Sequence, residues 1–346
     1  MRMAPFRADC KVRQYTQPRG MVNGNGWSER GRFNFALPGF AICSHAPFPM
    51  ARSSLGPSVE DLVRDACRGA AVPLRELLLR RGGLPGPRPN LKLAVAAAQA
   101  LVSGGDEGRR LIEEMRAMGD NEAPAGSAFP IFPMVGVLGL GVMAARAQEE
   151  GVLETALRAL HDHADDGRRE VRDAVVAALG LALKAQPLRT LEGLEGWSDG
   201  YFHAELMLQA LSDPSMAQHL QDVRLPLVRV QEAFALAAGA PRAHQRTHGY
   251  RALLRTMSGA IATLGTRFPH PVAQWVEEHA QVATKDLLAV LNTSLDQLSS
   301  GGLRRGDAQA VHQALDAAVP LPRDPRWDVG PTRGRGTKAR RKGRQG

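Results

Sequence analysis

Cysteine, aromatic and β-branched residues are all scarce in this chain of 346 residues. The three cysteines, Cys10, Cys43 and Cys67, lie far apart, form no Cys-x-x-Cys pair and are odd in number, so no disulfide framework is implied. Aromatic residues make up 5% of the chain, and Val and Ile are sparse beside Ala and Leu. Ala and Leu favour helices that pack through small, unbranched side chains, and the composition therefore predicts an almost purely helical protein.

Strand patterns are absent as well, because no segment shows a convincing alternation of apolar and polar residues. Helical patterns instead follow one another from Ser58 onward, separated by short Gly, Pro and Asp breaks, and the 44% hydrophobic content is ample for a buried core. The predicted helices span residues 58–69, 73–81, 90–103, 106–118, 130–148, 151–163, 167–185, 187–195, 199–212, 214–222, 226–238, 243–265, 270–299 (with a break) and 305–318.

The N-terminal segment lacks the apolar run that a secretory signal needs behind its first positive charges, so we expect a cytoplasmic protein. Residues 1–49 show neither helical nor strand periodicity and are rich in Gly, Pro, Arg and Asn, which predicts either a disordered segment or an extension that is not part of the native protein. At Met50 the character changes, and Ser58 with Asp61 then marks a helix start. We therefore hypothesise that Met50 is the true first residue. Detection by mass spectrometry of peptides from residues before Met50 in the native protein would contradict this hypothesis.

The formal net charge of +9 belongs to the ends of the chain. Residues 1–49 carry a net charge of +5 and residues 329–346 one of +7, which leaves residues 50–328 with a net charge of −3. The segment 323–346 should be a disordered basic tail that contacts RNA, DNA or an acidic protein, although it could also serve solubility alone. Its basic residues are Arg333, Arg335, Lys338, Arg340, Arg341, Lys342 and Arg344.

Three small-residue apolar segments recur at a spacing of 41 residues, starting at Leu93, Met134 and Val175. A more charged helical segment accompanies each one, so the repeating unit is a helix pair, and a period near 40 is typical of helical-pair solenoids.

The stretch "DDGRREVRDAVVAALGLAL", with Asp166 in the turn and Val171 and Arg172 opening the helix, resembles a HEAT repeat. "AELMLQALSDPSM" at 204–216, with its Asp213-Pro214 turn, is similar to the end of a first HEAT helix. The resemblance covers about residues 90–222. It implies an α-solenoid, a curved right-handed stack of antiparallel helix pairs, which in that family binds mostly proteins and sometimes nucleic acid. We therefore divide the body into HEAT-like repeats at 50–222 and a C-terminal helical region at 223–322.

The stretch "HDHADDG" from His161 suggests a metal site, because hydrolases of the metallo-β-lactamase type hold zinc with a His-x-His-x-Asp-His motif. That motif follows a strand, whereas the residues before His161 have helical periodicity, and residues two apart on a helix point about 200° away from each other. The last His of the motif is also replaced by Asp166. We predict instead that Asp165 and Asp166 cap the next helix, that Gly167 eases the turn, and that no metal is bound.

Residues 123–145 carry no charge over a length that could span a bilayer. Pro130, Pro133 and three glycines interrupt the segment, and it falls in register with the helical repeat, which favours a buried helix. The glycines Gly136, Gly139 and Gly141 follow no strand and do not form a dinucleotide-binding fingerprint.

The run from Pro241 to Arg255 is the best candidate for a phosphate-contacting surface in the body of the chain. It places His244, His248, Arg251 and Arg255 along one predicted helical stripe, with Arg242 and Arg246 beside it. Such residues can neutralise phosphates, or they can form a merely solvated helix face.

No nucleophile, metalloprotease or phosphate-loop motif is present, so we expect no catalysis and no cofactor. Trp197, Tyr201 and Trp275 are interpreted as packing residues. The first functional hypothesis is a non-catalytic scaffold that binds a protein partner through its helical surface, with the tail as an electrostatic aid. The alternative is nucleic-acid binding, possibly of the type of the alkylpurine DNA glycosylases built from HEAT-like repeats, which use aromatic and acidic residues in a basic groove.

Overall fold

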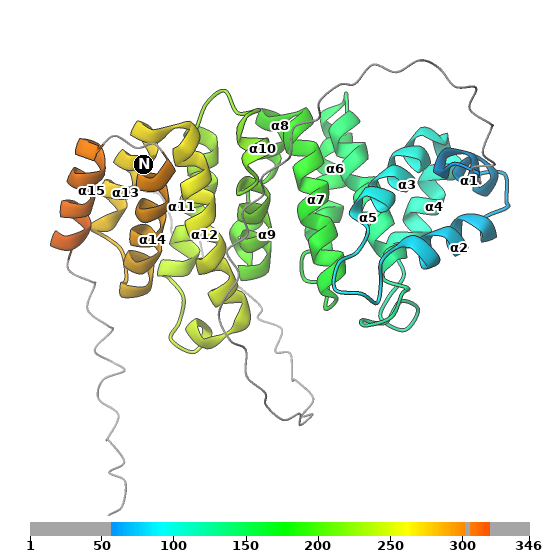
Figure 1. The fold of residues 1–346 in the computed structure, drawn as a ribbon, viewed down its shortest axis with the longest axis horizontal. Coiled ribbons are helices and arrows are strands. Elements are labelled where there is room, and N and C mark those ends of the chain that lie inside the picture. The colour runs from blue at the N-terminus through cyan, green and yellow to red at the C-terminus, as the bar shows by residue number, and fades with distance from the viewer. Residues whose placement is uncertain (1–56, 302–304, 319–346) are drawn as a thin grey trace, which may run out of the picture. The chain divides into compact units, whose positions relative to one another are not determined.

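Helices make up all the regular secondary structure of the residues that this computed structural model describes, 57–301 and 305–318 (Figure 1). This confirms the all-helical prediction, and within those residues no helix is long and apolar enough to cross a membrane. The predicted disordered segments 1–49 and 323–346 lie outside the described residues. The helices are α1 Val59–Ala66, α2 Val72–Arg81, α3 Leu91–Ser103, α4 Gly105–Arg116, α5 Ile131–Arg146, α6 Glu150–Asp162, α7 Arg169–Ala185, α8 Pro187–Gly193, α9 Tyr201–Leu211, α10 Pro214–Ala217, α11 Arg224–Ala238, α12 His248–Arg267, α13 Pro269–Ala280, α14 Lys285–Gly301 and α15 Arg305–Ala317, with two short 3-10 turns, η1 Trp197–Asp199 and η2 His244–Arg246.

Local capping explains where several of these helices begin. Ser58 accepts a hydrogen bond from the backbone N–H of Asp61 at 3.1 Å, and the Asp61 carboxylate reaches back to Ser58, which confirms the predicted start of α1. Asp213 caps α10 by accepting a hydrogen bond from the Ser215 N–H at 2.9 Å. Its other oxygen lies 2.9 Å from Lys184 Nζ, so this cap also ties α10 to α7.

The uncharged segment 123–145 contains α5, which lies almost entirely inside the hydrophobic core. Its glycines allow neighbouring helices to approach closely. A Cβ at Gly136 would meet the Arg116 backbone N at 2.4 Å, and one at Gly141 would meet the Ala178 Cα at 2.5 Å. Packing against α4 and α7 therefore accounts for these residues, and the buried-helix interpretation is confirmed.

Contacts between helices follow chain order (Figure 1). One series of contacts joins α1, α3, α5, α7, α9, α12 and α14 in turn. The intervening helices pack beside this series, as α4 and α6 do on α5, and α11 and α13 do on α12. The three apolar segments spaced by 41 residues lie in α3, α5 and α7, so successive repeats of the sequence are in direct contact.

The start of α12 differs from the prediction. The predicted helix began at residue 243, but α12 begins at His248, and residues 244–246 form the separate turn η2. The cause is Thr247, which has an extended backbone and whose hydroxyl accepts a hydrogen bond from the Tyr250 N–H. The prediction that His244, His248, Arg251 and Arg255 lie along one helix is therefore wrong, because His244 lies in η2 and the other three lie in α12.

Candidate functional site

The six residues of the body that were predicted to contact phosphate remain together on the surface, although two elements carry them. Arg242, His244 and Arg246 lie in or next to η2, while the other three lie on the first two turns of α12, and all six are exposed. We call this set, Arg242, His244, Arg246, His248, Arg251 and Arg255, the cationic surface. The predicted tail residues Arg333, Arg335, Lys338, Arg340, Arg341, Lys342 and Arg344 lie outside the described residues.

The arginines of the cationic surface differ from most others by having no acidic partner. The sequence holds no Asp or Glu between Glu232 and Glu277. Within the described residues, none of these four arginines forms an ion pair or hydrogen bond through its side chain. Their charges are therefore available to an external anion.

Elsewhere on the exposed helices, arginines commonly pair with a carboxylate three or four residues away. Arg64 with Asp61, Arg80 with Glu76 and Arg158 with Glu154 are examples, with N–O distances between 2.6 and 3.1 Å. Arg75 and Arg81 on α2 also form no ion pair with the described residues, so the distinguishing property of the cationic surface is that four such arginines lie in one segment without acids.

A partly buried carboxylate, Glu205 on α9, lies close to this surface. Burial raises its pKa above the ordinary value, while the nearby charges of Arg172, His248 and Arg255 act in the opposite direction. Asp173 on α7 behaves similarly, since burial raises its pKa as well. A carboxyl group with a raised pKa among cations is a common feature of functional sites.

Aromatic rings connect the cationic surface to α7 and α9. The guanidinium of Arg172 lies 5.2 Å from the ring centre of Phe202, and the His248 ring lies 6.1 Å from the same ring. Tyr201 packs edge-on against both His244 and Tyr250. Tyr250 is buried, and its burial raises its pKa to about 12, so it serves packing and offers no stacking surface.

The stretch "HDHADDG" forms the corner between α6 and α7, as the helical periodicity predicts. His161 lies in the last turn of α6 and His163 is its C-cap residue, and these two side chains do not share a site. His163 is partly buried, and this burial, followed by the charge of Arg116, lowers its pKa.

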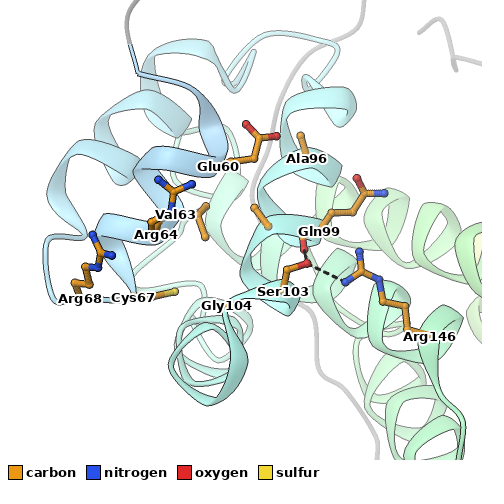
Figure 2. A pocket seen from close by; sticks show the side chains of 11 residues that line it. Glu60, Val63, Arg64, Cys67, Arg68, Ala96, Gln99, Ser103, Gly104 and Arg146 are labelled. Atoms are coloured by element: carbon orange, nitrogen blue, oxygen red, sulfur yellow. Dashed lines mark hydrogen bonds between the residues drawn. The ribbon is translucent and has the colours of Figure 1, made fainter.

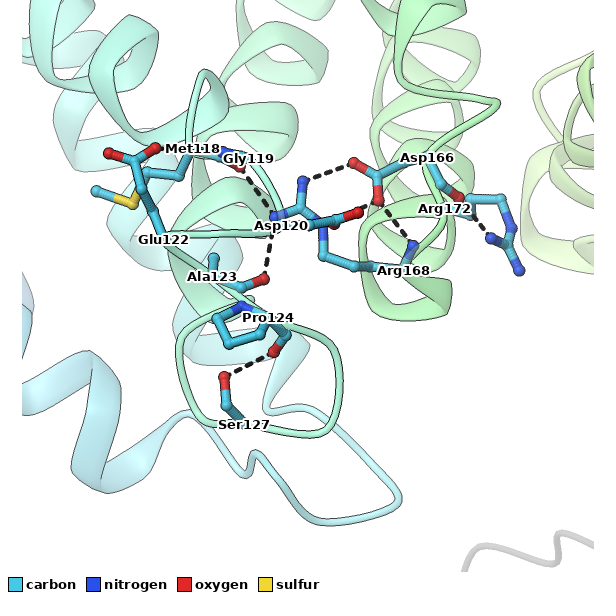
Figure 3. A network of polar contacts seen from close by, with 10 residues as sticks. All are labelled: Met118, Gly119, Asp120, Glu122, Ala123, Pro124, Ser127, Asp166, Arg168 and Arg172. Carbon is cyan, nitrogen blue, oxygen red and sulfur yellow. Dashed lines mark hydrogen bonds and ion pairs between the residues drawn. The ribbon is translucent and has the colours of Figure 1, made fainter. Parts of the chain in front are cut away.

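The predicted capping role of Asp165 and Asp166 is wrong. No side chain caps α7, whose N-cap residue is Arg168. Asp166 instead accepts hydrogen bonds from the guanidinium of Arg168 at 2.9 and 2.6 Å and from its backbone N–H at 2.8 Å (Figure 3). Burial raises the pKa of Asp166, but the hydrogen bonds from Arg168 outweigh it and the pKa lies below its usual value. Gly167 does not have a positive φ, so the backbone conformation of the turn does not require a glycine at this position.

Arg168 uses its remaining donors to hold the loop between α4 and α5. Its guanidinium donates to the backbone carbonyls of Met118 at 2.9 Å and Ala123 at 3.1 Å, and the side chain is only 4% exposed (Figure 3). The aspartate of the sequence motif therefore forms a local ion pair with Arg168, and Arg168 in turn links the start of α7 to the loop between α4 and α5. An aspartate just before a helix can either cap that helix or pair with a nearby arginine. The sequence alone does not distinguish these two roles for Asp166.

His161 is near two residues that the sequence does not associate with it, Asp199 in η1 and His203 on α9. Its Nε2 lies 3.1 Å from Asp199 Oδ1, and Nδ1 of His203 lies 3.3 Å from the same oxygen. The two imidazole rings are stacked with centres 3.9 Å apart. Burial lowers the pKa of His203, and the neighbouring His161 lowers it further. We call His161, Asp199 and His203 the histidine cluster.

The structure also contains two hollows. One, of about 490 Å³, lies beside α1 and α3 and holds the unpaired Cys67, and Arg146 reaches its edge to donate a hydrogen bond to Ser103 at 3.0 Å (Figure 2). The other, of about 650 Å³, is a more apolar groove between α8 and α11 that includes the exposed Leu188 and Val228. Trp197 and Trp275, interpreted as packing residues, are both buried.

Comparison of the chain with protein-family models, with curated proteins and with solved structures finds no match.

Proposed function

We propose that this chain is a non-catalytic scaffold, built as a HEAT-like α-solenoid of antiparallel helix pairs, which binds an acidic protein partner on the cationic surface. The contact series from α1 to α14 and the 41-residue spacing of α3, α5 and α7 support the repeat architecture. The observation that carries the function is the group of four exposed arginines that form no ion pair with any described residue. Arginine is well suited to carboxylate recognition, because its planar guanidinium can donate two parallel hydrogen bonds.

A protein partner fits this surface better than duplex nucleic acid because the partly buried Glu205 lies near Arg255, although the two form no ion pair, and Asp173 lies near Glu205. Glu205 and Asp173 would repel a continuous phosphate backbone, and residues 50–328 carry a net charge of −3. A protein can place its carboxylates opposite the arginines and leave apolar or basic groups opposite these two acids. The basic residues of 329–346 would add non-specific electrostatic attraction.

Affinity purification with charge-reversal variants tests this function. The variant Arg251→Glu/Arg255→Glu should lose a protein partner that the wild type retains after nuclease treatment. The matched control is Arg75→Glu/Arg81→Glu, which changes two exposed arginines of α2 by the same charge and should retain the partner. Equal retention by both double variants would contradict the proposal.

Nucleic-acid binding is the second candidate, and the position of Glu205 favours it. A carboxylate with a raised pKa beside Arg172, Phe202 and His248 combines an acid, cations and an aromatic ring, as base-excision chemistry requires. If the chain releases bases from alkylated DNA, and Glu205→Gln abolishes that release, this candidate replaces the scaffold. Loss of all retained material on nuclease treatment would point in the same direction.

A further inference from the structure

We propose that the histidine cluster binds one divalent transition-metal ion, with Zn²⁺ as the best-suited metal. His161 Nε2, Asp199 Oδ1 and His203 Nδ1 supply the three ligand atoms, which all lie within 4.8 Å of one another. Two imidazole nitrogens and one carboxylate oxygen form a ligand set that suits zinc, iron(II) and cobalt(II). The site is independent of the cationic surface and of the function proposed above.

The two nitrogen-to-oxygen distances in the cluster match those between ligands of one ion, and the two nitrogens lie within 4.8 Å of each other. Ligand atoms about 2.0–2.1 Å from a tetrahedral zinc ion lie about 3.3–3.4 Å from each other. The two nitrogen-to-oxygen distances in the cluster are 3.1 and 3.3 Å. Only the ring orientation has to change: the rings are 10° from parallel, so their in-plane lone pairs cannot meet at one point until one ring tilts. His161 is the ring that can tilt, because its side chain is 26% exposed whereas that of His203 is 9% exposed.

A buried nitrogen without a hydrogen bond is the second observation that points to a ligand. His203 Nδ1 is buried and has no hydrogen-bond partner among the described residues, because its contact with Asp199 lacks hydrogen-bonding geometry. Leaving a buried polar atom unpaired is unfavourable, and a metal ion would satisfy it. Gly200 keeps this nitrogen accessible, since a Cβ at that position would lie 2.4 Å from it.

The surroundings of the cluster are those expected of a metal site. Asp165 Oδ2 lies 3.8 Å from the other ring nitrogen of His203, Nε2, which is longer than a hydrogen bond, but a shift of its exposed side chain would bring it close enough to orient the imidazole and increase its basicity. Trp197 is buried and packs edge-on against His161, at 5.3 Å between ring centres, which shields one side of the cluster. Asp199 is 56% exposed, so an ion can enter from solvent and keep a water molecule as its fourth ligand.

Zinc titration of the full-length, tag-free chain after treatment with a chelator tests the proposal. We expect one tight equivalent of Zn²⁺ per chain, measured by calorimetry and by metal analysis after desalting. Asp199→Asn and His161→Ala should each raise the dissociation constant by at least about tenfold, and Asp165→Asn by about tenfold, as expected for a carboxylate that orients a ligand. Both Asp199 and His161 are partly exposed, so these variants should fold even if a change at the buried His203 does not.

His163→Ala is the matched control, because it removes the other histidine of the same sequence stretch while leaving the cluster intact. It should bind zinc as the wild type does. Binding of cobalt(II) provides a second measurement. At one equivalent of cobalt(II), the wild type should develop the intense visible absorption of a tetrahedral site and should lose Trp197 fluorescence. Asp199→Asn should show neither change. Absence of a stoichiometric site in the wild type, or equal weakening by His163→Ala, would overturn the proposal.

Discussion

Replacing Arg168 with alanine should destabilise the protein severely, because this side chain is the centre of a buried ion pair. The substitution leaves the Asp166 carboxylate, 11% exposed, without its guanidinium partner, and it leaves the carbonyls of Met118 and Ala123 without their donor. Removing one partner of a buried ion pair costs about 3–5 kcal/mol. The bulk of this cost comes from the charge that stays buried and unpaired.

Urea unfolding followed by circular dichroism measures this loss as a lower midpoint at unchanged slope. Arg158→Ala provides the control, since it breaks an ion pair with Glu154 in which both side chains are more than 60% exposed. Surface pairs of this kind contribute about 0–1 kcal/mol. If Arg168→Ala proves no more destabilising than Arg158→Ala, the argument from the buried pair is wrong. The double variant Asp166→Ala/Arg168→Ala should be more stable than Arg168→Ala, because it no longer buries an unpaired carboxylate.

The effect of Arg168→Ala should also depend on pH. The pKa of Asp166 is lower in the folded protein than its ordinary value, so ionised Asp166 favours folding. This contribution is fully present above the unfolded pKa of about 3.9 and is lost as the pH falls through the lower folded value. The difference in unfolding free energy between wild type and variant should therefore shrink under acidic conditions. A difference that is independent of pH would contradict the assigned role of the carboxylate.

Three further substitutions probe other parts of the fold. Glu205→Gln should stabilise the protein at pH 7, because the raised pKa of Glu205 in the folded protein makes its ionised form unfavourable there. This gain in stability should vanish below the unfolded pKa of about 4.3. Urea midpoints at several pH values test this, and a loss of stability at pH 7 would contradict it. Gly136→Ala should lower the free energy of unfolding by about 1–3 kcal/mol, because its Cβ would force α5 away from α4. Gly180→Ala should raise the free energy of unfolding by about 0.5–1 kcal/mol, because a Cβ there meets nothing within 4 Å. Thermal unfolding measures both, and changes of the same sign would refute the packing argument. Gln186→Met should lower the free energy of unfolding by about 1–3 kcal/mol, since the Gln186 amide donates to three carbonyls at the end of α5 at 2.9–3.2 Å. Chemical denaturation measures this loss, and an unchanged midpoint would show that water satisfies the three carbonyls in the variant.

The helices of this protein could be predicted from the sequence because their signals are local. The composition favoured helices throughout, Ser58 with Asp61 marked the start of α1, and the predicted break within residues 270–299 appears between α13 and α14. The start of α12 was missed although its signal was present. Thr247 is a good N-cap residue, but helical periodicity alone does not show whether the chain turns before it.

The pairing of Asp166 with Arg168 was not predicted, although the two residues are only two apart in the sequence. The position of Asp166 before α7 predicted a cap, and the competing interaction was a bidentate pair with Arg168, whose other donors reach carbonyls about 45 residues earlier. The sequence shows that Asp166 can accept a hydrogen bond and that Arg168 can donate one, but only the tertiary arrangement shows that the carbonyls of Met118 and Ala123 hold the guanidinium beside Asp166.

The histidine cluster was missed for a related reason, and the sequence did contain a usable signal for it. Several contacts join residues at nearly constant sequence separations: Arg146 with Ser103 and Tyr201 with His244 at 43 residues, and Gln186 with the end of α5 at 39 to 42. His161 and His203 are 42 residues apart, which is a similar separation, whereas the sequence motif at His161 contains only candidate ligands that are close along the chain. Where the helices of a periodic sequence contact one another in chain order, pairs of potential metal ligands are therefore expected one sequence period apart as well as within one motif, because such contacts bring residues one period apart together.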